Sequence, residues 1–220
     1  MPVTTPVLEV SGLSLGFRQD GRMLGVLDGI SFRAEAGKTL AIVGESGCGK
    51  SVASLAIMGL LPDNAQVSGS ARLMGRDLLG MSAEERRALR GAEMAMIFQE
   101  PMTSLNPAYT VGSQMTEVLR RHRGTPRAQA VDRAVELLTR VGITAPGLRL
   151  GQFPHQLSGG LRQRVMIAMA LMCDPELLIA DEPTTALDVT VQAQILRLLA
   201  ELQKDLGLGI LLITHDLGIV

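Results

Sequence analysis

The residues best suited to chemistry lie in one glycine-rich stretch between a predicted strand at residues 39–43 and a predicted helix at residues 51–61. This stretch consists of Gly44, Glu45, Ser46, Gly47, Cys48, Gly49, Lys50 and Ser51. It matches the G-x-x-x-x-G-K-[ST] pattern, in which backbone N–H groups surround phosphates, the lysine reaches the β and γ phosphates, and the hydroxyl ligates Mg²⁺. A glycine-rich turn that binds nothing is the alternative. The complete pattern between strand and helix favours a nucleotide triphosphate and Mg²⁺ site.

Two adjacent carboxylates follow the apolar run at residues 177–180. A strand there would deliver Asp181 and Glu182 at its carboxyl end, where open α/β sheets bind ligands. Successive side chains of a strand point in opposite directions, so we expect Asp181 to hold the Mg²⁺ shell and Glu182 to act as general base toward a water. An isolated pair of this kind is more often a solvated turn or a helix cap. The phosphate loop on the same chain favours the catalytic interpretation.

A second helix start suited to anions lies at residues 157–164. Ser158 is the predicted N-cap of a helix at residues 159–172, and two glycines, the second of them Gly160, follow it. One nucleotide rarely needs two such helix starts, so this one would serve a nucleotide held by another copy of the chain. Ordinary capping with a tight turn explains the same residues equally well, and the motif by itself leaves both interpretations open.

Hydrophobic patterning predicts the strands and helices that position these motifs. Apolar strands separated by helices predict an α/β fold with a parallel sheet covered on both faces, and the first two strands predict an antiparallel N-terminal layer. A capping box, Ser82 with Glu85, opens one of the helices. Further strands are predicted at residues 7–17, 29–33, 70–74, 94–98 and 210–213, and further helices at 82–90, 111–122, 127–141 and 189–205.

Composition excludes several classes of protein. With 46% hydrophobic and 20% charged residues and a net charge of -1, the chain is neither disordered nor a polybasic nucleic-acid binder. One Tyr, four Phe and no Trp leave no aromatic platform for bases, so no nucleic-acid partner is expected. The longest apolar run, nine residues at 165–173, is far shorter than the roughly 20 of a membrane span. No signal peptide is readable and two cysteines make no disulfide framework, so a reducing cytosol is expected.

Charge is distributed unevenly along the chain. Residues 72–164 hold 14 Arg and 8 acidic residues, a net charge of +6, whereas the remainder carries a net charge of -7. Solvated helices explain this asymmetry. A middle subdomain whose surface faces an anionic partner explains the uneven charge as well.

In combination, these motifs resemble those of the ATP-binding-cassette ATPases that drive membrane transporters. The phosphate loop, Gln99, residues 157–163, the Asp181-Glu182 strand, residues 186–188 and His215 occur in that family's order and approximate spacing. Residues 44–47, 98–107 and 181–194 are most similar to the ATPase subunits of dipeptide, oligopeptide and nickel importers. The resemblance covers essentially the whole chain. It implies a P-loop (RecA-like) NTPase with a catalytic core at residues 1–98 and 174–220 and an inserted helical subdomain at residues 99–173.

The resemblance also implies roles for individual residues. Gln99 matches the glutamine that senses Mg²⁺ and the attacking water. Ser158 and Gly160 match the residues that contact the γ-phosphate bound to the opposite subunit. Asp188 matches the aspartate that communicates across that dimer interface, and His215 matches the histidine that contacts the γ-phosphate.

The remaining aromatic, histidine and cysteine residues carry weaker signals. Phe17 lies where the family places an aromatic that stacks on adenine, and a core residue at the end of a strand is equally consistent with it. His122 and His155 are expected to be surface or loop residues. Cys48 and Cys173 lack metal-ligand spacing and are interpreted as small packing residues.

The function implied is that of a cytoplasmic ATPase subunit, peripheral on the inner face of the cell membrane. It would pair with a second ATPase subunit, identical or different, and drive import of a peptide or related small solute through transmembrane permease subunits that a solute-binding protein serves. Two alternatives are a non-transport ATPase of the same superfamily and an ATP-gated interaction module without turnover. The lack of a heptad run argues against the first, and the intact Glu182 and His215 argue against the second.

Two expectations concern segments at the edges of these motifs. Residues 100–109 are proline-broken, and Met102, Leu105 and Tyr109 in them are expected to dock a helix from the permease. Members of the family continue beyond the histidine, so this chain, which ends at Val220, is expected to be an N-terminal fragment.

Overall fold

The computed structural model describes residues 6–99, 104–185, 187–216 and 218. Within them, two four-stranded sheets are ordered β2-β1-β4-β5 and β3-β8-β7-β6. The strands are β1 (Leu8–Gln19), β2 (Arg22–Ala34), β3 (Thr39–Val43), β4 (Ala65–Leu73), β5 (Arg76–Asp77), β6 (Met94–Ile97), β7 (Leu177–Asp181) and β8 (Gly209–Thr214). The helices are α1 (Lys50–Met58), α2 (Ala83–Leu89), α4 (Val111–Arg123), α5 (Arg127–Arg140), α6 (Pro146–Leu150), η1 (Pro154–Gln156), α7 (Gly159–Ala170) and α8 (Val189–Leu206).

The second sheet is parallel throughout and is buried on both faces. Leu178 and Ala180 of β7 belong to the apolar cluster that α7 and α8 contribute to. Leu177 and Ile179, which alternate with them, belong to the cluster formed with α1 and the antiparallel sheet. Two covered faces require apolar side chains at every position, which explains the uninterrupted apolar strands of the sequence. The predicted α/β fold with a covered parallel sheet is therefore confirmed.

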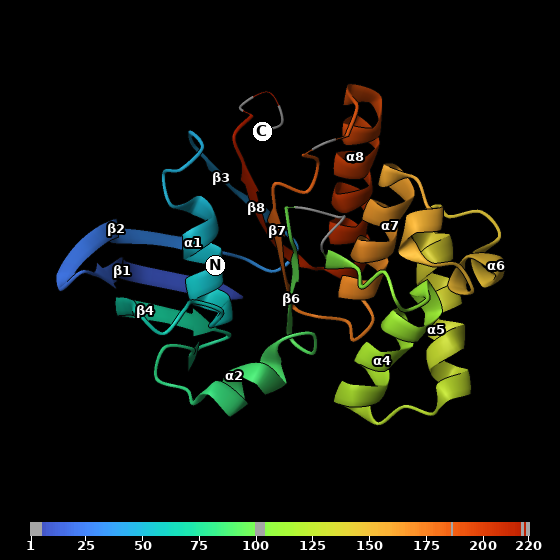
Figure 1. Ribbon diagram of the computed structural model, residues 1–220, viewed down its shortest axis with the longest axis horizontal. Coiled ribbons are helices and arrows are strands. Elements are labelled where there is room, and N and C mark those ends of the chain that lie inside the picture. The colour runs from blue at the N-terminus through green and yellow to red at the C-terminus, as the bar shows by residue number, and fades with distance from the viewer. Residues whose placement is uncertain (1–5, 100–103, 186, 217, 219–220) are drawn as a thin grey trace, which may run out of the picture.

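The first sheet is antiparallel and lies on the α1 side of the parallel sheet (Figure 1). Its first hairpin turns at Asp20 and Gly21, whose φ angles of 50° and 76° suit the tight turn that pairs Gln19 with Arg22. The predicted second strand, residues 29–33, covers only the last part of β2, since Gly25 interrupts the alternation of apolar and polar residues before it. The Asp-Gly turn signal at residues 20–21 explains why the strand begins earlier.

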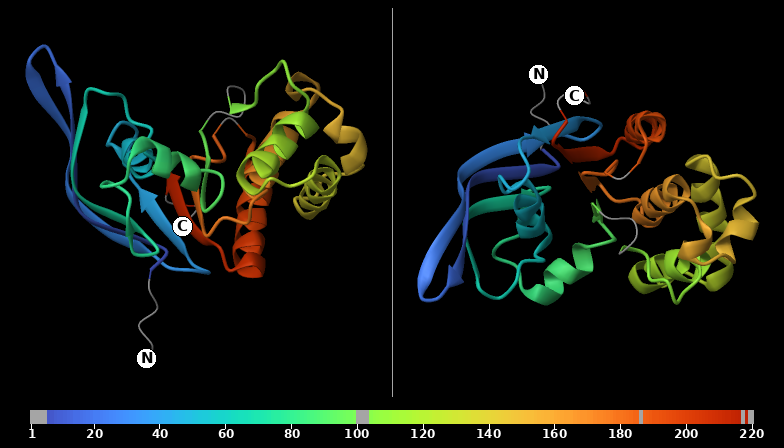
Figure 2. Two further views of the ribbon diagram at one scale, coloured as in Figure 1. Left: turned by 90° about the horizontal axis from the view of Figure 1, so that it is seen from below. Right: turned by 45° about the horizontal axis from the view of Figure 1, so that its top comes forward.

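The helices α4, α5, α6 and α7 gather on the opposite side of the parallel sheet from α1 (Figure 1), and the other views agree (Figure 2). Two short elements there, α6 and η1, are absent from the sequence analysis. Each begins with a proline, Pro146 or Pro154, whose fixed φ suits the first position of a helix. Within the described part of the chain, no helix has the length and apolar character needed to cross a membrane.

The side chains of two serines cap helices as the sequence predicts. Ser82 and Glu85 form a capping box, in which the hydroxyl accepts from the Glu85 N–H at 3.2 Å and the carboxylate accepts from the Ser82 N–H at 2.8 Å. The Ser158 hydroxyl accepts from the Leu161 N–H at 3.4 Å and caps α7. Both helix starts are confirmed.

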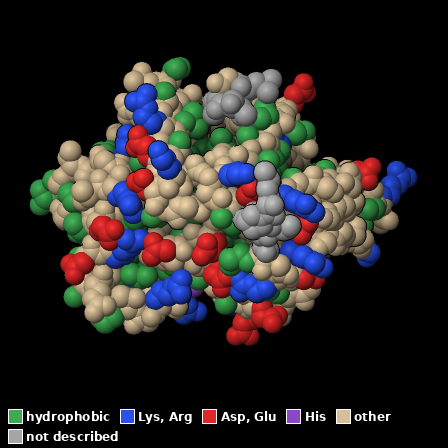
Figure 3. Space-filling view, turned by 180° about the vertical axis from the view of Figure 1, so that it is seen from behind, with side chains coloured by type: hydrophobic (Ala, Val, Ile, Leu, Met, Phe, Trp, Pro, Cys, Tyr) green, Lys and Arg blue, Asp and Glu red, His purple; other side chains and the backbone are tan. Residues whose placement is uncertain are grey.

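Several arginines of residues 72–164 are used inside the fold, because their guanidinium groups donate to backbone carbonyl oxygens. The pairs are Arg90 with Met58 at 2.9 Å, Arg123 with Cys173 at 3.1 Å and Arg162 with Pro154 at 2.7 Å. On the face drawn in Figure 3, Lys and Arg side chains lie among Asp and Glu side chains, without a continuous basic patch. Structural use of arginine accounts for part of the charge asymmetry.

One expectation about the segment at residues 100–109 is wrong. Leu105 is only 1% exposed and packs in the core with residues of α4 and α7, so its side chain offers no docking surface. Tyr109 is 56% exposed. Met102 lies outside the described residues.

Candidate active site

The phosphate loop, residues 44–51, connects β3 to α1 with a backbone that its glycines permit. Gly47 and Gly49 have φ angles of 85° and 93°, and a Cβ at Gly49 would lie 2.8 Å from Cδ2 of Leu27. The Lys50 side chain is buried, and its ammonium donates to the carbonyl oxygens of Gly44 at 2.6 Å and Glu45 at 2.7 Å. The loop thus holds one positive charge at the start of a helix, a combination that suits phosphate.

The two cysteines differ in their surroundings. Cys173 is buried, as expected of a packing residue. Cys48 is exposed in the phosphate loop, so its interpretation as a packing residue is wrong. Turn residues at a loop tip face solvent even when they are small and apolar.

A hydrogen bond joins the phosphate loop to the end of β7. The Ser51 hydroxyl donates to Oδ1 of Asp181 at 3.0 Å. Burial raises the pKa of Asp181 and the nearby Glu182 carboxylate raises it further, whereas the Ser51 hydrogen bond and the Lys50 ammonium lower it. A buried carboxylate whose charge is so disfavoured is suited to a cation, and a hydroxyl with a carboxylate is an oxygen pair that Mg²⁺ accepts. The residues present therefore fit Mg²⁺.

Glu182 directly follows β7 and has the left-handed φ of 45°, which is uncommon for a residue other than glycine. Its N–H donates to the carbonyl oxygen of Ile213 at 2.9 Å. Its carboxylate atom Oε2 accepts from Nε2 of Gln99 at 2.9 Å and from the Thr185 hydroxyl at 3.0 Å, and lies 3.2 Å from Nδ1 of His215. Among the described residues, no hydrogen bond uses the other oxygen, Oε1. We name Glu182, Gln99, Thr185 and His215 the Glu182 cluster.

Sheet topology explains why residues so distant in sequence meet. Strands β3, β8, β7 and β6 run parallel, so their carboxyl ends share one edge of the sheet. The phosphate loop follows β3, Glu182 follows β7 and His215 follows β8, while Gln99 lies two residues after β6. The structure thus brings together most of the residues that the sequence singles out.

Ser158, Gly160 and Asp188 form a separate group at the starts of α7 and α8. Asp188 caps α8 by accepting from the Val191 N–H at 3.0 Å, and a Cβ at Gly160 would lie 3.0 Å from Cγ1 of Val191. The two helices therefore begin side by side. Ser158 and Asp188 are exposed, as is the neighbouring Val189 at 80%. Ala186 lies outside the described residues.

Three other residues that the sequence singles out belong to neither group. Phe17 is half-buried in β1 and packs against the core cluster of the antiparallel sheet. His155 is exposed and stacks on the ring of Phe153 with centroids 5.6 Å apart. His122 is half-buried in α4.

Thr185 is a contact of Glu182 that the sequence analysis misses. Its N–H donates to the Glu182 carbonyl oxygen at 3.1 Å, so residues 182–185 form a turn that returns its hydroxyl to the carboxylate. A hydroxyl three residues after a carboxylate, within a turn-forming sequence, is the signal that could have found it.

A family model described as ABC transporter matches residues 27–185. This chain belongs to the ABC transporter family. The resemblance stated from its motifs is confirmed.

Two curated proteins from Bacillus subtilis are similar to this chain. The oligopeptide transport ATP-binding protein OppD is 54% identical over 98% of the chain and 61% of its own length. The dipeptide transport ATP-binding protein DppD is 52% identical over 97% of the chain and 64% of its own length. The chain thus spans less than two thirds of the length of these relatives.

A solved ABC structure supports the fold. It is the dimeric post-hydrolysis state of an ATP-binding cassette bound to ADP and Pi, with a TM-score of 0.83 and 25% identity over 96% of this chain and 89% of that chain. The predicted P-loop fold is confirmed.

Proposed function

We propose that this chain is the ATP-binding and ATP-hydrolysing subunit of a membrane importer for peptides or a related small solute. The observation that carries the proposal is the meeting of the phosphate loop, Asp181 and the Glu182 cluster at one edge of the parallel sheet. Relatives named for dipeptide and oligopeptide transport support the class of solute.

Nucleotide binding is assigned to the phosphate loop. Its backbone N–H groups and the Lys50 ammonium hold the β and γ phosphates of ATP, and α1 adds the positive end of its dipole. Ser51 and Asp181 would hold Mg²⁺, which when bound supplies positive charge against the charge that develops on the phosphates. Phe17 is proposed to stack on adenine, since β1 exposes part of its ring.

Hydrolysis is assigned to Glu182 as general base. With Oε2 occupied by donors, Oε1 accepts a proton from the attacking water as that water forms a bond to the γ-phosphorus. The bond from the γ-phosphorus to the bridging oxygen breaks, and ADP and phosphate result. Gln99 orients the carboxylate by its hydrogen bond, and His215 adds a contact on the same oxygen and reaches toward the γ-phosphate.

The group of Ser158, Gly160 and Asp188 is assigned to a head-to-tail dimer with a second ATPase subunit, identical or different. The exposed start of α7 provides anion-binding N–H groups, and the exposed Val189 side chain at the start of α8 provides an apolar contact. The solved cassette with the same fold is itself dimeric.

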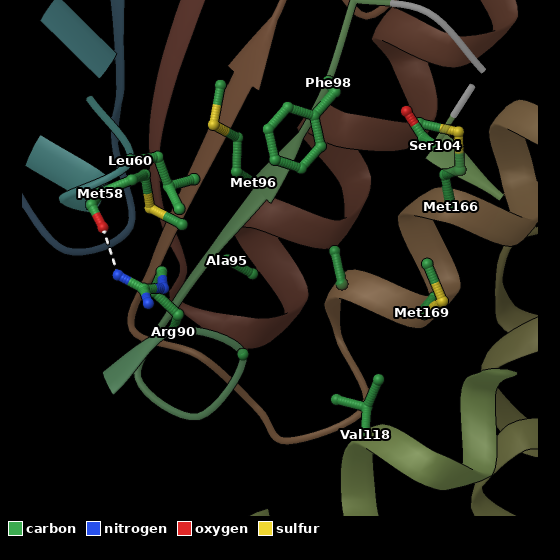
Figure 4. A pocket seen from close by; sticks show the side chains of 12 residues that line it. Met58, Leu60, Arg90, Ala95, Met96, Phe98, Ser104, Val118, Met166 and Met169 are labelled. Atoms are coloured by element: carbon green, nitrogen blue, oxygen red, sulfur yellow. Dashed lines mark hydrogen bonds between the residues drawn. The ribbon is translucent and has the colours of Figure 1, made fainter. Parts of the chain in front are cut away.

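Contact with transmembrane permease subunits is assigned to an apolar pocket of about 300 Å³. It lies between the end of α1 and β6 on one side and α4 and α7 on the other (Figure 4). Phe98, which is 41% exposed, borders this pocket and directly precedes Gln99 of the Glu182 cluster. Residues 99–173 would act as the helical subdomain between permease and catalytic core, and the subunit would lie peripherally on the inner membrane face. A solute-binding protein would act only through the permease.

Phosphate release from ATP by the full-length protein tests this proposal. We expect release that needs Mg²⁺ and stops when the metal is chelated, because Asp181 and Ser51 form its site. In proteoliposomes with the permease, we expect peptide to stimulate release and ATP to drive peptide uptake. A protein that binds ATP with Mg²⁺ and releases no phosphate would contradict the catalytic proposal, whereas release without peptide uptake would contradict only the transport proposal.

A further inference from the structure

We propose that Thr185 is a positioning residue for the base. Its hydroxyl donates to Oε2 of Glu182 at 3.0 Å and thereby fixes the rotation of the carboxylate that presents Oε1 to the attacking water. This inference rests on the proposed function, because it matters only if Glu182 accepts the proton.

The turn at residues 182–185 aims the Thr185 hydroxyl. Glu182 has a φ of 45° and its carbonyl oxygen accepts the Thr185 N–H at 3.1 Å, so both ends of the turn are tied by the backbone. Thr184 and Leu187 are tied to α8, because the Gln192 amide donates to the carbonyl oxygen of Thr184 at 3.2 Å and to that of Leu187 at 3.1 Å. A hydroxyl on so restrained a loop loses little further entropy when it bonds the carboxylate.

The three contacts of Oε2 are not equivalent. The Glu182 side chain is 10% exposed, whereas the His215 side chain is 56% exposed and Gln99 is exposed as well. Gln99 and His215 belong to loops that follow other strands, so movement of those loops alters their contacts. Thr185 is half-buried and moves with Glu182 as part of the same turn. Its contact therefore holds the carboxylate whatever the other two loops do.

A small cavity lined by polar residues lies next to the turn, and its size determines whether a water can replace the Thr185 hydroxyl in a variant. Its volume is about 40 Å³, enough for one water. Glu182, Thr184, Thr185, Gln192, Thr214, His215 and Asp216 line it. Thr185→Ala enlarges this space, so a water can replace the lost hydroxyl in part. Thr185→Val keeps the volume and supplies no donor, so nothing replaces it.

The experiment measures kcat and KM for ATP in the full-length protein with Mg²⁺. We expect Thr185→Ser to keep the wild-type kcat, because it keeps the hydroxyl. Thr185→Val should lower kcat about tenfold, which corresponds to the loss of one hydrogen bond to a charged group. Thr185→Ala should lower kcat about threefold, because a water replaces part of that bond. KM should stay within about twofold, because the phosphate contacts are elsewhere. Thr144→Val is the matched control, since Thr144 is exposed between α5 and α6 and belongs to neither the Glu182 cluster nor the assigned dimer contact.

Glu182→Gln, measured in parallel, tests the role of Glu182 as base separately from the role of Thr185 as its positioning residue. Wild-type kcat in Glu182→Gln would overturn the proposed base and with it the role of Thr185, whereas a wild-type protein that releases no phosphate would overturn the proposed function. A large loss in Glu182→Gln together with wild-type kcat in both Thr185→Ala and Thr185→Val would overturn only the role of Thr185. Equal losses in the Ser, Ala and Val variants would also overturn it, because a structural role would not depend on the hydroxyl. If Thr185→Val does not fold, the Ser and Ala variants decide the question by the same comparison.

Discussion

Two adjacent carboxylates at the end of β7 have different surroundings. Asp181 is the last residue of the strand and is buried, and the Ser51 hydroxyl of the phosphate loop donates a hydrogen bond to it. Glu182 lies just past the strand in a left-handed conformation, and side chains from three different loops contact its Oε2 atom. One carboxylate is hydrogen-bonded to the contiguous phosphate loop, and the other is contacted by side chains from several separate loops.

The proposed chemistry is divided between two regions, the phosphate loop with Asp181 and the Glu182 cluster. The phosphate loop and Asp181 are joined by hydrogen bonds within this chain, so we expect this region to bind nucleotide by itself. The Glu182 cluster depends on Gln99 and His215, which follow β6 and β8. Changes in the first region should therefore alter ATP affinity, and changes in the second should alter turnover.

The largest effect on affinity is expected for Lys50→Ala. The buried ammonium bonds two carbonyl oxygens of the loop and is the charge assigned to the phosphates, so its loss should weaken ATP binding by about 10²-fold. Titration calorimetry with Mg-ATP measures this. Lys38→Ala is the control, because Lys38 is 69% exposed and pairs with Glu35. ATP affinity within twofold of wild type in Lys50→Ala would remove the phosphate loop from the account.

An intermediate effect is expected at the pocket of Figure 4. Phe98→Asp places a charge on an apolar surface next to Gln99 and should weaken binding to the permease about tenfold, while ATP affinity stays unchanged. Binding of purified permease in detergent measures this. Leu148→Asp is the matched control, since Leu148 is 78% exposed on α6, away from the pocket. Unchanged permease affinity for Phe98→Asp would place the interface elsewhere.

A smaller effect on stability is expected for Asp181→Asn. Because burial raises the pKa of Asp181, its ionised form at neutral pH costs free energy of folding, and the neutral amide removes that cost. We expect the melting temperature without Mg²⁺ to rise by about 2 °C and added Mg²⁺ to stabilise the variant less than wild type. Asp188→Asn is the control, because asparagine caps a helix as well as aspartate does. A lower melting temperature in Asp181→Asn would contradict the assigned cost.

The smallest effect concerns pH and His122. Burial, followed by Arg121 and Arg123, lowers the pKa of His122, so the folded state favours the neutral ring. The stability that this provides is present above about pH 6.5 and is lost as pH falls through the lowered pKa. Urea unfolding of His122→Gln should therefore show a weaker loss of stability between neutral and acid pH than wild type. The same substitution at exposed His155 is the control, and an equal change at both positions would contradict the assignment.

The contrast between the two regions also explains what could be predicted from the sequence. The phosphate loop is contiguous, and its glycines and lysine carry the site within eight positions, so pattern alone identifies it. Helix caps such as Ser82 and Ser158 are equally local and were predicted correctly. In the Glu182 cluster, the hydrogen bond from Gln99 to Glu182 joins positions 83 residues apart, so only the resemblance to a family pointed to Gln99 and His215.

Other features escaped prediction for related reasons. The left-handed conformation of Glu182 is imposed by the loop after β7 and leaves no mark on hydrophobic periodicity. In the sequence, Leu105 lies between Pro101 and Pro107, in a stretch that predicts an irregular exposed segment. It nevertheless packs in the core, because tertiary contacts decide the burial of a single apolar residue in a loop. Its burial could not be read from the local pattern.

Single-turnover phosphate release by Glu182→Gln tests the central claim most directly. With the protein in excess over Mg-ATP, the rate of the first turnover reports on the bond-breaking step and not on product release. The account predicts a rate at least about 10²-fold below wild type, with ATP affinity within twofold, because Glu182 accepts the proton and the phosphate loop holds the nucleotide. A wild-type single-turnover rate in this variant, or a matching loss of ATP affinity, would contradict the division between the two regions.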